Sequence, residues 1–167
     1  MRTLSLRGGA SLPVLGLGTW GLGEDPARRA AEVRIVRAAL EAGYRLIDTA
    51  EMYGEGGAEE VVGQALDESV RAGDVRRDEV FVVSKVYPHN ASLRGTPAAC
   101  DRSRRRLMLD HIDLYLLHWP GQHPLEDTVQ ALQSLVAEGA MESAWAQNRR
   151  AEFEVTSPAA PLVRPQP

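Results

Sequence analysis

The sequence has one cysteine, one lysine and few aromatic residues, and it lacks a long apolar run. Because Cys100 is the single cysteine, an internal disulfide and a cysteine-rich zinc site are excluded within these 167 residues. No apolar stretch approaches the ~18 residues of a membrane span, and no apolar block follows Met1 and Arg2 as it would in a signal peptide. We therefore expect a cytoplasmic protein that has no membrane partner.

Negative charge exceeds positive charge. The formal net charge is −4, opposite in sign to that of a typical nucleic-acid-binding protein, so we expect no nucleic-acid partner. Of the 19 Lys and Arg residues, Lys85 alone is a lysine. Four arginines lie close together on one predicted helix, and we interpret them as a solvated helix face: Arg102, Arg104, Arg105 and Arg106.

A repeated strand-then-helix pattern runs through most of the chain. Residues 1–14, with a glycine turn at Gly8 and Gly9, predict a β-hairpin. Four later strands are predicted to end at residues 18, 48, 85 and 118, in steps of 30, 37 and 33 residues, close to one βαβ repeat. Helical patterns follow these ends, at about residues 26–43, 58–70, 96–109 and 124–139. The strands are apolar on both faces, as a parallel sheet covered by helices requires.

The pattern stops at Gly139. Residues 140–167 show no strand or helix period, and four of the ten prolines lie in the last ten residues, which predicts a disordered tail. A closed eightfold β/α barrel takes roughly 250 residues. We therefore expect residues 15–139 to form an α/β fold, the N-terminal half of a (β/α)8 TIM barrel with about four β/α units.

Three chemically active side chains lie at predicted strand ends. Asp48, Lys85 and His118 each end a strand, and Tyr53 lies in the loop after Asp48. In a β/α barrel these ends point into one mouth, so the four side chains are expected to meet there. Lys85 follows apolar strand residues and Ser84, where a cation is unfavourable unless it is paired.

Together these residues make sense as a proton-donating site. A free phenol is a poor acid at neutral pH, but an ammonium beside Tyr53 stabilises its phenolate. Asp48 would keep Lys85 charged and aimed, and His118 could share or orient the proton at a carbonyl oxygen. Hydride must come from elsewhere, since no side chain donates it. Considered one at a time, each residue also has a purely structural interpretation. Asp48 would cap the following loop, Tyr53 would be a half-buried surface aromatic, and His118 would be a packed core histidine.

Two other motifs have simpler interpretations. Residues 16–21 match the dinucleotide pattern G-x-G-x-x-G, but four further residues, 22–25, intervene before a helix can begin at Pro26. We interpret this segment as a glycine-rich strand end and loop. No third ligand accompanies His118 and His123, so no metal site is predicted.

Four segments are similar to the aldo-keto reductase family: residues 15–20, 43–54, 82–86 and 113–120. The likeness is greatest to bacterial members that reduce small aldehydes and diketones. It implies a barrel that binds NADPH without a Rossmann motif and takes a small carbonyl substrate. It also implies that Tyr53 is the general acid, that Lys85 and Asp48 tune it, and that His118 orients the substrate.

The resemblance implies binding residues as well. The positions that match cofactor contacts of this family are Gly18, Thr19, Trp20 and Asp48. The substrate pocket would be lined by Trp20, Tyr87 and Trp119. After Gly139 the family continues with a further strand, whereas residues 140–143 begin an unrelated sequence. We therefore expect a truncated reductase.

Other functions remain open from the sequence. The chain could be an inactive truncated relic, or a half-barrel scaffold that self-associates through its open sheet edges. It could also be a lyase in which Lys85 forms a Schiff base with a carbonyl substrate.

Overall fold

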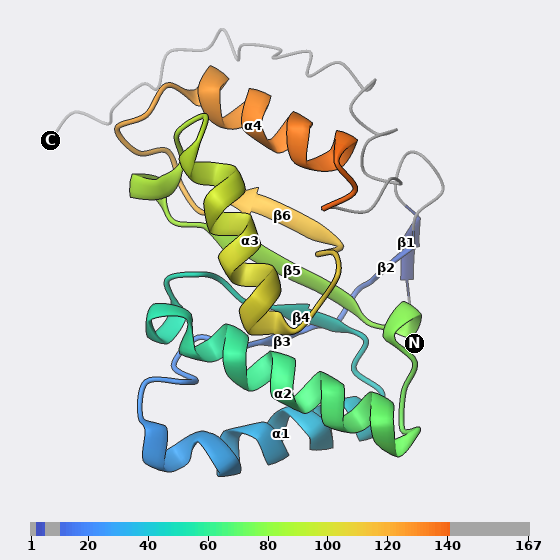
Figure 1. Ribbon diagram of the computed structural model, residues 1–167. Coiled ribbons are helices and arrows are strands. Elements are labelled where there is room, and N and C mark those ends of the chain that lie inside the picture. The colour runs from blue at the N-terminus through green and yellow to red at the C-terminus, as the bar shows by residue number, and fades with distance from the viewer. Residues whose placement is uncertain (1–2, 6–10, 141–167) are drawn as a thin grey trace, which may run out of the picture.

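The computed structural model describes residues 3–5 and 11–140, in which strands and helices alternate along the chain (Figure 1). Two short strands, β1 (Thr3–Ser5) and β2 (Ser11–Pro13), pair antiparallel with Leu4 opposite Leu12. The glycine turn predicted between them lies outside the described residues, and so does residue 141 onward of the predicted tail. No helix in the described part of the chain is long and apolar enough to cross a membrane.

Four parallel strands form the main sheet, in the order β3-β4-β5-β6. They are β3 (Leu17–Gly18), β4 (Leu46–Asp48), β5 (Phe81–Val86) and β6 (Leu114–Leu117). One helix follows each strand: α1 (Arg29–Glu41), α2 (Gly57–Ala72), α3 (Gly95–Leu107) and α4 (Leu125–Ala137). Short 3₁₀ turns lie in the connections: η1 (Pro26–Arg28), η2 (Tyr53–Gly56), η3 (Arg77–Glu79) and η4 (Pro88–Asn90). The expected α/β half barrel of four units is confirmed.

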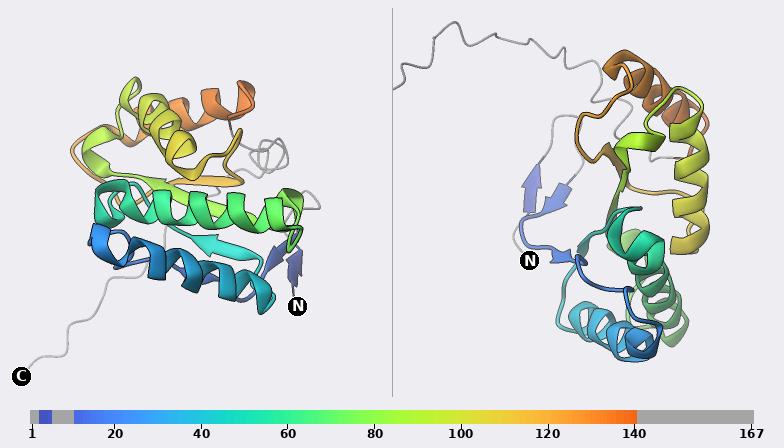
Figure 2. Two further views of the ribbon diagram at one scale, coloured as in Figure 1. Left: turned by 60° about the horizontal axis from the view of Figure 1, so that its bottom comes forward. Right: turned by 90° about the vertical axis from the view of Figure 1, so that its left-hand side faces the viewer.

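The helices follow one another around the convex side of the curved sheet (Figure 2). Successive side chains of β5 point to opposite faces of the sheet. Val82, Ser84 and Val86 face the helices and are fully buried. Phe81 and Lys85 face the other way and keep partial exposure. The concave side of the sheet is therefore where reactive side chains can meet solvent.

The helix signals in the sequence are confirmed at α1 and corrected at α3. Asp25 accepts a hydrogen bond from the Ala27 amide at 2.9 Å and caps η1, and Gly43 follows α1 with φ 96°. Thr96 followed by Pro97 predicts an N-cap at Thr96, but this prediction is wrong because α3 begins at Gly95 and Thr96 lies in its first turn. Ser92 holds the first turn of α3 instead, since its hydroxyl accepts from the Gly95 amide at 3.0 Å.

The buried face of α4 agrees only in part with the predicted one. The apolar spacing predicts a core-facing stripe of Leu125, Val129, Leu132 and Val136. Val136 is buried and Leu132 packs against the core, but Leu125 and Val129 are 55% and 45% exposed. The buried residues of this helix are Thr128, Ala131, Leu135 and Val136. Thr128 can be buried because its hydroxyl donates to the Ala91 carbonyl at 2.6 Å, which satisfies this polar group in the core.

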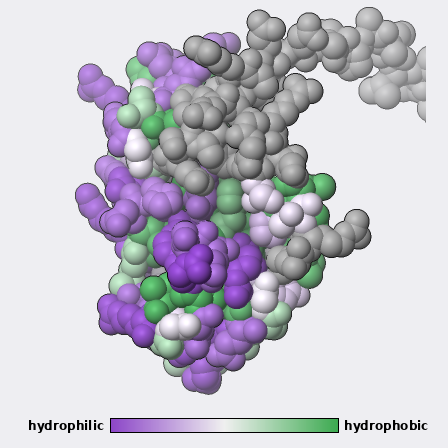
Figure 3. Space-filling view, turned by 90° about the vertical axis from the view of Figure 1, so that its right-hand side faces the viewer, coloured by the Kyte–Doolittle hydropathy of each residue, from purple (hydrophilic) through white to green (hydrophobic). Residues whose placement is uncertain are grey.

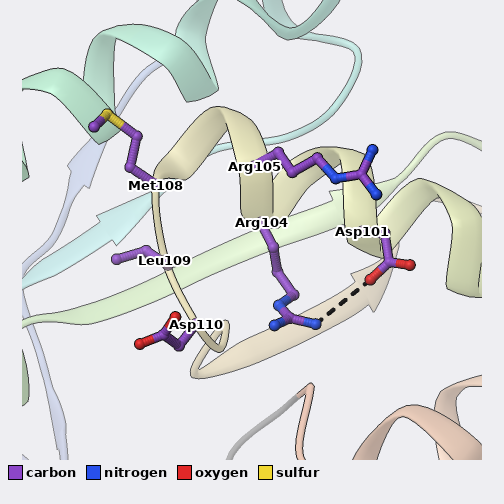
Figure 4. Close-up of a pocket in the computed structure, with 6 residues that line it drawn as sticks. All are labelled: Asp101, Arg104, Arg105, Met108, Leu109 and Asp110. Atoms are coloured by element: carbon purple, nitrogen blue, oxygen red, sulfur yellow. Dashed lines mark hydrogen bonds and ion pairs between the residues drawn. The ribbon is translucent and has the colours of Figure 1, made fainter.

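A pocket of about 330 Å³ lies where α3 ends (Figure 4). It is lined by Asp101, Arg104, Arg105, Met108, Leu109 and Asp110. These residues precede β6, so the pocket belongs to the end of the sheet at which the strands begin. Polar side chains gather near the middle of that face (Figure 3). The chemically active strand ends lie at the opposite end of the sheet.

We expect Met108→Gly to stabilise the protein. Met108 ends α3 with φ 56° and a side chain that is 57% exposed. A left-handed conformation costs a residue with a Cβ about 1–2 kcal/mol, and glycine avoids that strain. Urea unfolding should therefore show a gain of about 1 kcal/mol. Met108→Ala keeps the Cβ and is the control; an equal gain in both variants would contradict the strain argument.

Candidate active site

Lys85 and Asp48 form an ion pair where β4 and β5 end. The register places Asp48 opposite Val83, so Asp48 and Lys85 project from the same face of the sheet. The Lys85 Nζ lies 2.6 Å from Asp48 Oδ1, and it also donates to the Thr49 carbonyl at 3.0 Å. A third contact, at 3.4 Å, joins Nζ to the Tyr53 hydroxyl. The Lys85 side chain is only 13% exposed, and these three oxygens satisfy its charge.

The loop after Asp48 turns sharply and leaves Tyr53 beside Lys85. Gly54, Glu55 and Gly56 follow Tyr53 with φ of 56°, 52° and 96°, a left-handed turn that leads into α2. Glycine suits this turn for a second reason at position 54, where a Cβ would lie 2.8 Å from the Gly23 carbonyl oxygen. The β3–α1 loop therefore packs directly on the Tyr53 turn and supports it.

Aromatic rings form a continuous chain of contacts that includes the Tyr53 ring. Trp20 meets the Tyr53 ring edge-on with 5.1 Å between centroids, and His118 meets it at 5.5 Å. Trp119 lies against His118 at 4.6 Å, and Tyr87 contacts Trp119 at 5.5 Å. The four residues predicted to act together are thus brought together, and the three predicted pocket residues lie around them.

His118 continues β6 into the site. Its amide donates to the Val86 carbonyl at 3.1 Å, which holds the ring at the strand end. Partial burial lowers the pKa of His118 below its ordinary value, the Lys85 ammonium lowers it further, and Asp48 opposes the shift. The ring is therefore uncharged at neutral pH and can donate one N–H.

The predicted cofactor residues lie where β3 meets β4. Gly18 pairs with Asp48, and a Cβ at Gly18 would have no other atom within 4 Å, so its backbone is open on that side. Thr19 is fully buried, and both its amide and its hydroxyl donate to the Asp48 carbonyl, at 3.0 and 3.1 Å. Trp20 is 71% exposed. Thr19 therefore anchors the loop that presents Gly18 and Trp20.

The arginine run on α3 is not a simple solvated face. Arg102 donates to the buried Glu51 at 2.9 Å, and Arg106 donates to the buried Glu59 at 3.2 Å. These arginines are four residues apart, so they share one side of the helix. The sequence interpretation is wrong for them because their partners, Glu51 and Glu59, lie far away in the chain. The i, i+4 spacing places the two arginines on one face but does not show which acids lie opposite.

Two hollows flank Tyr87. One of about 400 Å³ is lined by Glu51, Met52, Glu55, Tyr87, His89 and Arg106. The other, of about 260 Å³, is lined by Tyr87, Pro88, His89, Trp119 and Gln122. Tyr87 and His89 line both hollows.

A parallel β/α half barrel with Asp, Tyr, Lys and His at its strand ends has the layout of a TIM-barrel oxidoreductase. The model of the Aldo/keto reductase family matches residues 14–144. The chain belongs to the aldo/keto reductase family, and the expected resemblance is confirmed.

Known relatives share about the same stretch. The chain is 49% identical over 138 residues to the methylglyoxal reductase YeaE of Escherichia coli, covering 83% of this chain and 46% of that protein. It is 40% identical over 137 residues to the glyoxal reductase of Bacillus subtilis, covering 82% and 46%. A solved aldo/keto reductase from Klebsiella pneumoniae in complex with NADP and acetate is 49% identical with a TM-score of 0.74, covering 83% and 47%. The chain spans about half the length of the curated relatives it matches.

The charges around His118 predict opposite effects of two substitutions. Lys85→Met removes a cation and is expected to raise the pKa of His118 toward its ordinary value, whereas Asp48→Asn removes an opposing anion and is expected to lower it. NMR titration of the imidazole signals measures both. If Lys85→Met leaves the His118 titration unchanged, the ammonium does not act on that ring.

The same pKa shift links stability to pH. Because the pKa of His118 is lowered by folding, the unfolded chain takes up this proton first as pH falls below about 6.5. Its stabilising contribution is therefore present above about pH 6.5 and is lost as pH falls through the folded pKa.

Proposed function

We propose that this chain carries the proton-donating site of an NADPH-dependent reductase that converts a small aldehyde or ketone to an alcohol. The contact that carries the proposal is the placement of Lys85 Nζ between the Asp48 carboxylate and the Tyr53 hydroxyl, at 2.6 and 3.4 Å. A phenol held beside a paired ammonium is suited to release a proton, since the cation stabilises the phenolate that remains.

Each residue of the proposed site has one role. Tyr53 donates its proton to the carbonyl oxygen of the substrate, and Lys85 offsets the negative charge that develops on the phenolate. Asp48 holds Lys85 charged and aimed. His118, uncharged at neutral pH, donates an N–H that orients the same carbonyl oxygen. NADPH, when bound, supplies the hydride that no side chain can supply.

The residues at the end of β3 fit such a cofactor. The open backbone of Gly18 allows a flat ring to approach closely. Beside it stand the exposed Trp20 indole and the Asp48 side chain, which is 45% exposed. We propose that Gly18, Thr19, Trp20 and Asp48 form the site for the nicotinamide end, with Thr19 contributing indirectly, because its bonds to the Asp48 carbonyl anchor the loop. The NADP-bound relative from Klebsiella pneumoniae supports NADPH as the cofactor.

Aromatic walls favour a small substrate. Trp20 contacts the Tyr53 ring, Trp119 contacts His118, and Tyr87 contacts Trp119, so these three aromatic residues are suited to line the pocket of a compact carbonyl compound. The relatives named methylglyoxal reductase and glyoxal reductase support small dicarbonyl compounds as the substrate class.

The ion pair argues against the lyase alternative. Schiff-base formation needs the lone pair of a neutral amine. A carboxylate 2.6 Å from Nζ favours the ammonium, which has no free lone pair. Trapping of a carbonyl compound on Lys85 by borohydride would instead support the lyase.

Tyr53→Phe tests the proposed reaction. We expect the unmodified protein to change NADPH fluorescence and to reduce methylglyoxal, and we expect Tyr53→Phe to lower kcat by about 10² or more, the usual contribution of a general acid. Tyr44→Phe is the matched control, because Tyr44 precedes β4 at the other end of the sheet and should leave kcat unchanged.

Two results would contradict the proposal. Equal loss or equal retention of activity in the two tyrosine variants would remove the role of Tyr53. If the unmodified protein neither binds NADPH nor reduces methylglyoxal, the inactive or scaffold alternative is favoured, and analytical ultracentrifugation then separates those two by the presence of self-association.

A further inference from the structure

Glu51 links the two segments that carry the proposed site. It lies two residues before Tyr53, and its amide donates to the Lys85 carbonyl at 3.2 Å. Its side chain, 9% exposed, accepts the Tyr87 amide at 3.1 Å on one oxygen. The other oxygen accepts Asn90 Nδ2 at 2.5 Å and the Arg102 guanidinium at 2.9 Å. Glu51 is thus bonded to the main chain of Lys85 within β5 and to the main chain of Tyr87 just beyond it.

These bonds continue the pairing of β4 with β5 beyond the sheet. The ladder runs from Thr49, whose amide donates to the Val83 carbonyl at 2.9 Å, to Glu51 and Lys85. At the next step the Glu51 carboxylate takes the place of a strand carbonyl and accepts the Tyr87 amide. The buried carboxylate is favourable here because three donors, one of them cationic, satisfy it.

We propose that Glu51 is a positioning residue that fixes Tyr53 against Lys85 and holds Tyr87 as the wall facing Trp119. This inference deepens the proposed function and rests on it for its catalytic meaning. Without the carboxylate, the Tyr87 amide and the Arg102 guanidinium lose a buried partner, and the segments after β4 and β5 are free to separate. The 3.4 Å contact between Tyr53 and Lys85 then lengthens, and the ammonium stabilises the phenolate less.

Asp113, which directly precedes β6, provides a matched control because it bonds the other end of β5. Its side chain is also 9% exposed, and it also joins a β5 amide to an arginine. It accepts the Val82 amide at 2.8 Å and the Arg77 guanidinium at 2.6 Å, at the end where β5 begins. Asp113→Asn and Glu51→Gln therefore make the same chemical change in equally buried acids at opposite ends of β5.

The first measurement needs no activity. Selective NMR labelling of tyrosine reports the Tyr53 and Tyr87 ring signals, which the neighbouring Trp20, His118 and Trp119 rings displace. We expect Glu51→Gln to move or broaden both signals and Asp113→Asn to leave them in place, while both variants lower stability in urea. Asn90→Ala removes one of the three donors and is expected to cause a smaller change in the same direction; it serves if Glu51→Gln fails to fold.

The second measurement is kinetic. With methylglyoxal and NADPH, Glu51→Gln is expected to lower kcat about tenfold and to shift the alkaline limb of the pH profile of kcat, whereas Asp113→Asn changes neither. Unmoved tyrosine signals in Glu51→Gln and Asn90→Ala, or equal displacement in Glu51→Gln and Asp113→Asn, would overturn the positioning role. Absence of turnover in the unmodified protein would overturn the proposed function alone, because the NMR comparison still tests Glu51.

Discussion

The ion pair between Lys85 and Asp48 is the contact on which the rest of the site depends. An ammonium that is mostly buried must be surrounded by acceptors, and all three of its acceptors come from residues 48–53. One pairing of β4 with β5 therefore satisfies the cation completely. A slip of one residue would turn Lys85 toward the helices, where Val82 and Val86 are fully buried, and away from its three acceptors. The register in which β4 pairs with β5 therefore also decides whether the Lys85 ammonium finds its hydrogen-bond acceptors.

The surrounding loops hold this arrangement from both sides. On the β3 side, Thr19 makes two hydrogen bonds to the Asp48 carbonyl and so fixes the strand end that carries the carboxylate. After Tyr53, the left-handed turn at Gly54 packs against Gly23 of the β3–α1 loop. The Glu51 carboxylate ties the same segment to the Tyr87 amide. The flexible parts of a β/α unit are here bonded to their neighbours, which keeps the phenol and the ammonium in contact.

The sequence predicts the strand ends well because Asp48, Lys85 and His118 each interrupt an apolar run, and a parallel sheet brings such ends together. It does not predict the orientation of the Tyr53 side chain toward Lys85, which depends on the left-handed turn that follows. Nor does it predict that Thr128 replaces Leu125 in the core, because helical spacing shows which residues share a face and not what lies opposite. Acids far away in the chain decide which arginines of α3 are buried partners, and sequence spacing alone does not identify them.

Three buried carboxylates hold β5, the strand that carries Lys85. Asp113 accepts the Val82 amide, Glu59 accepts the Ser84 hydroxyl, and Glu51 accepts the Tyr87 amide just beyond the strand. Each acid also pairs with an arginine: Arg77, Arg106 and Arg102, respectively. A forked guanidinium reaches a buried acid while its other donors bond elsewhere, as Arg77 does with the Val80 carbonyl. At position 85 the requirement is different, since a compact ammonium must fit among three oxygens. Lys85, the single lysine of the sequence, meets this requirement through its contacts with Asp48, Thr49 and Tyr53.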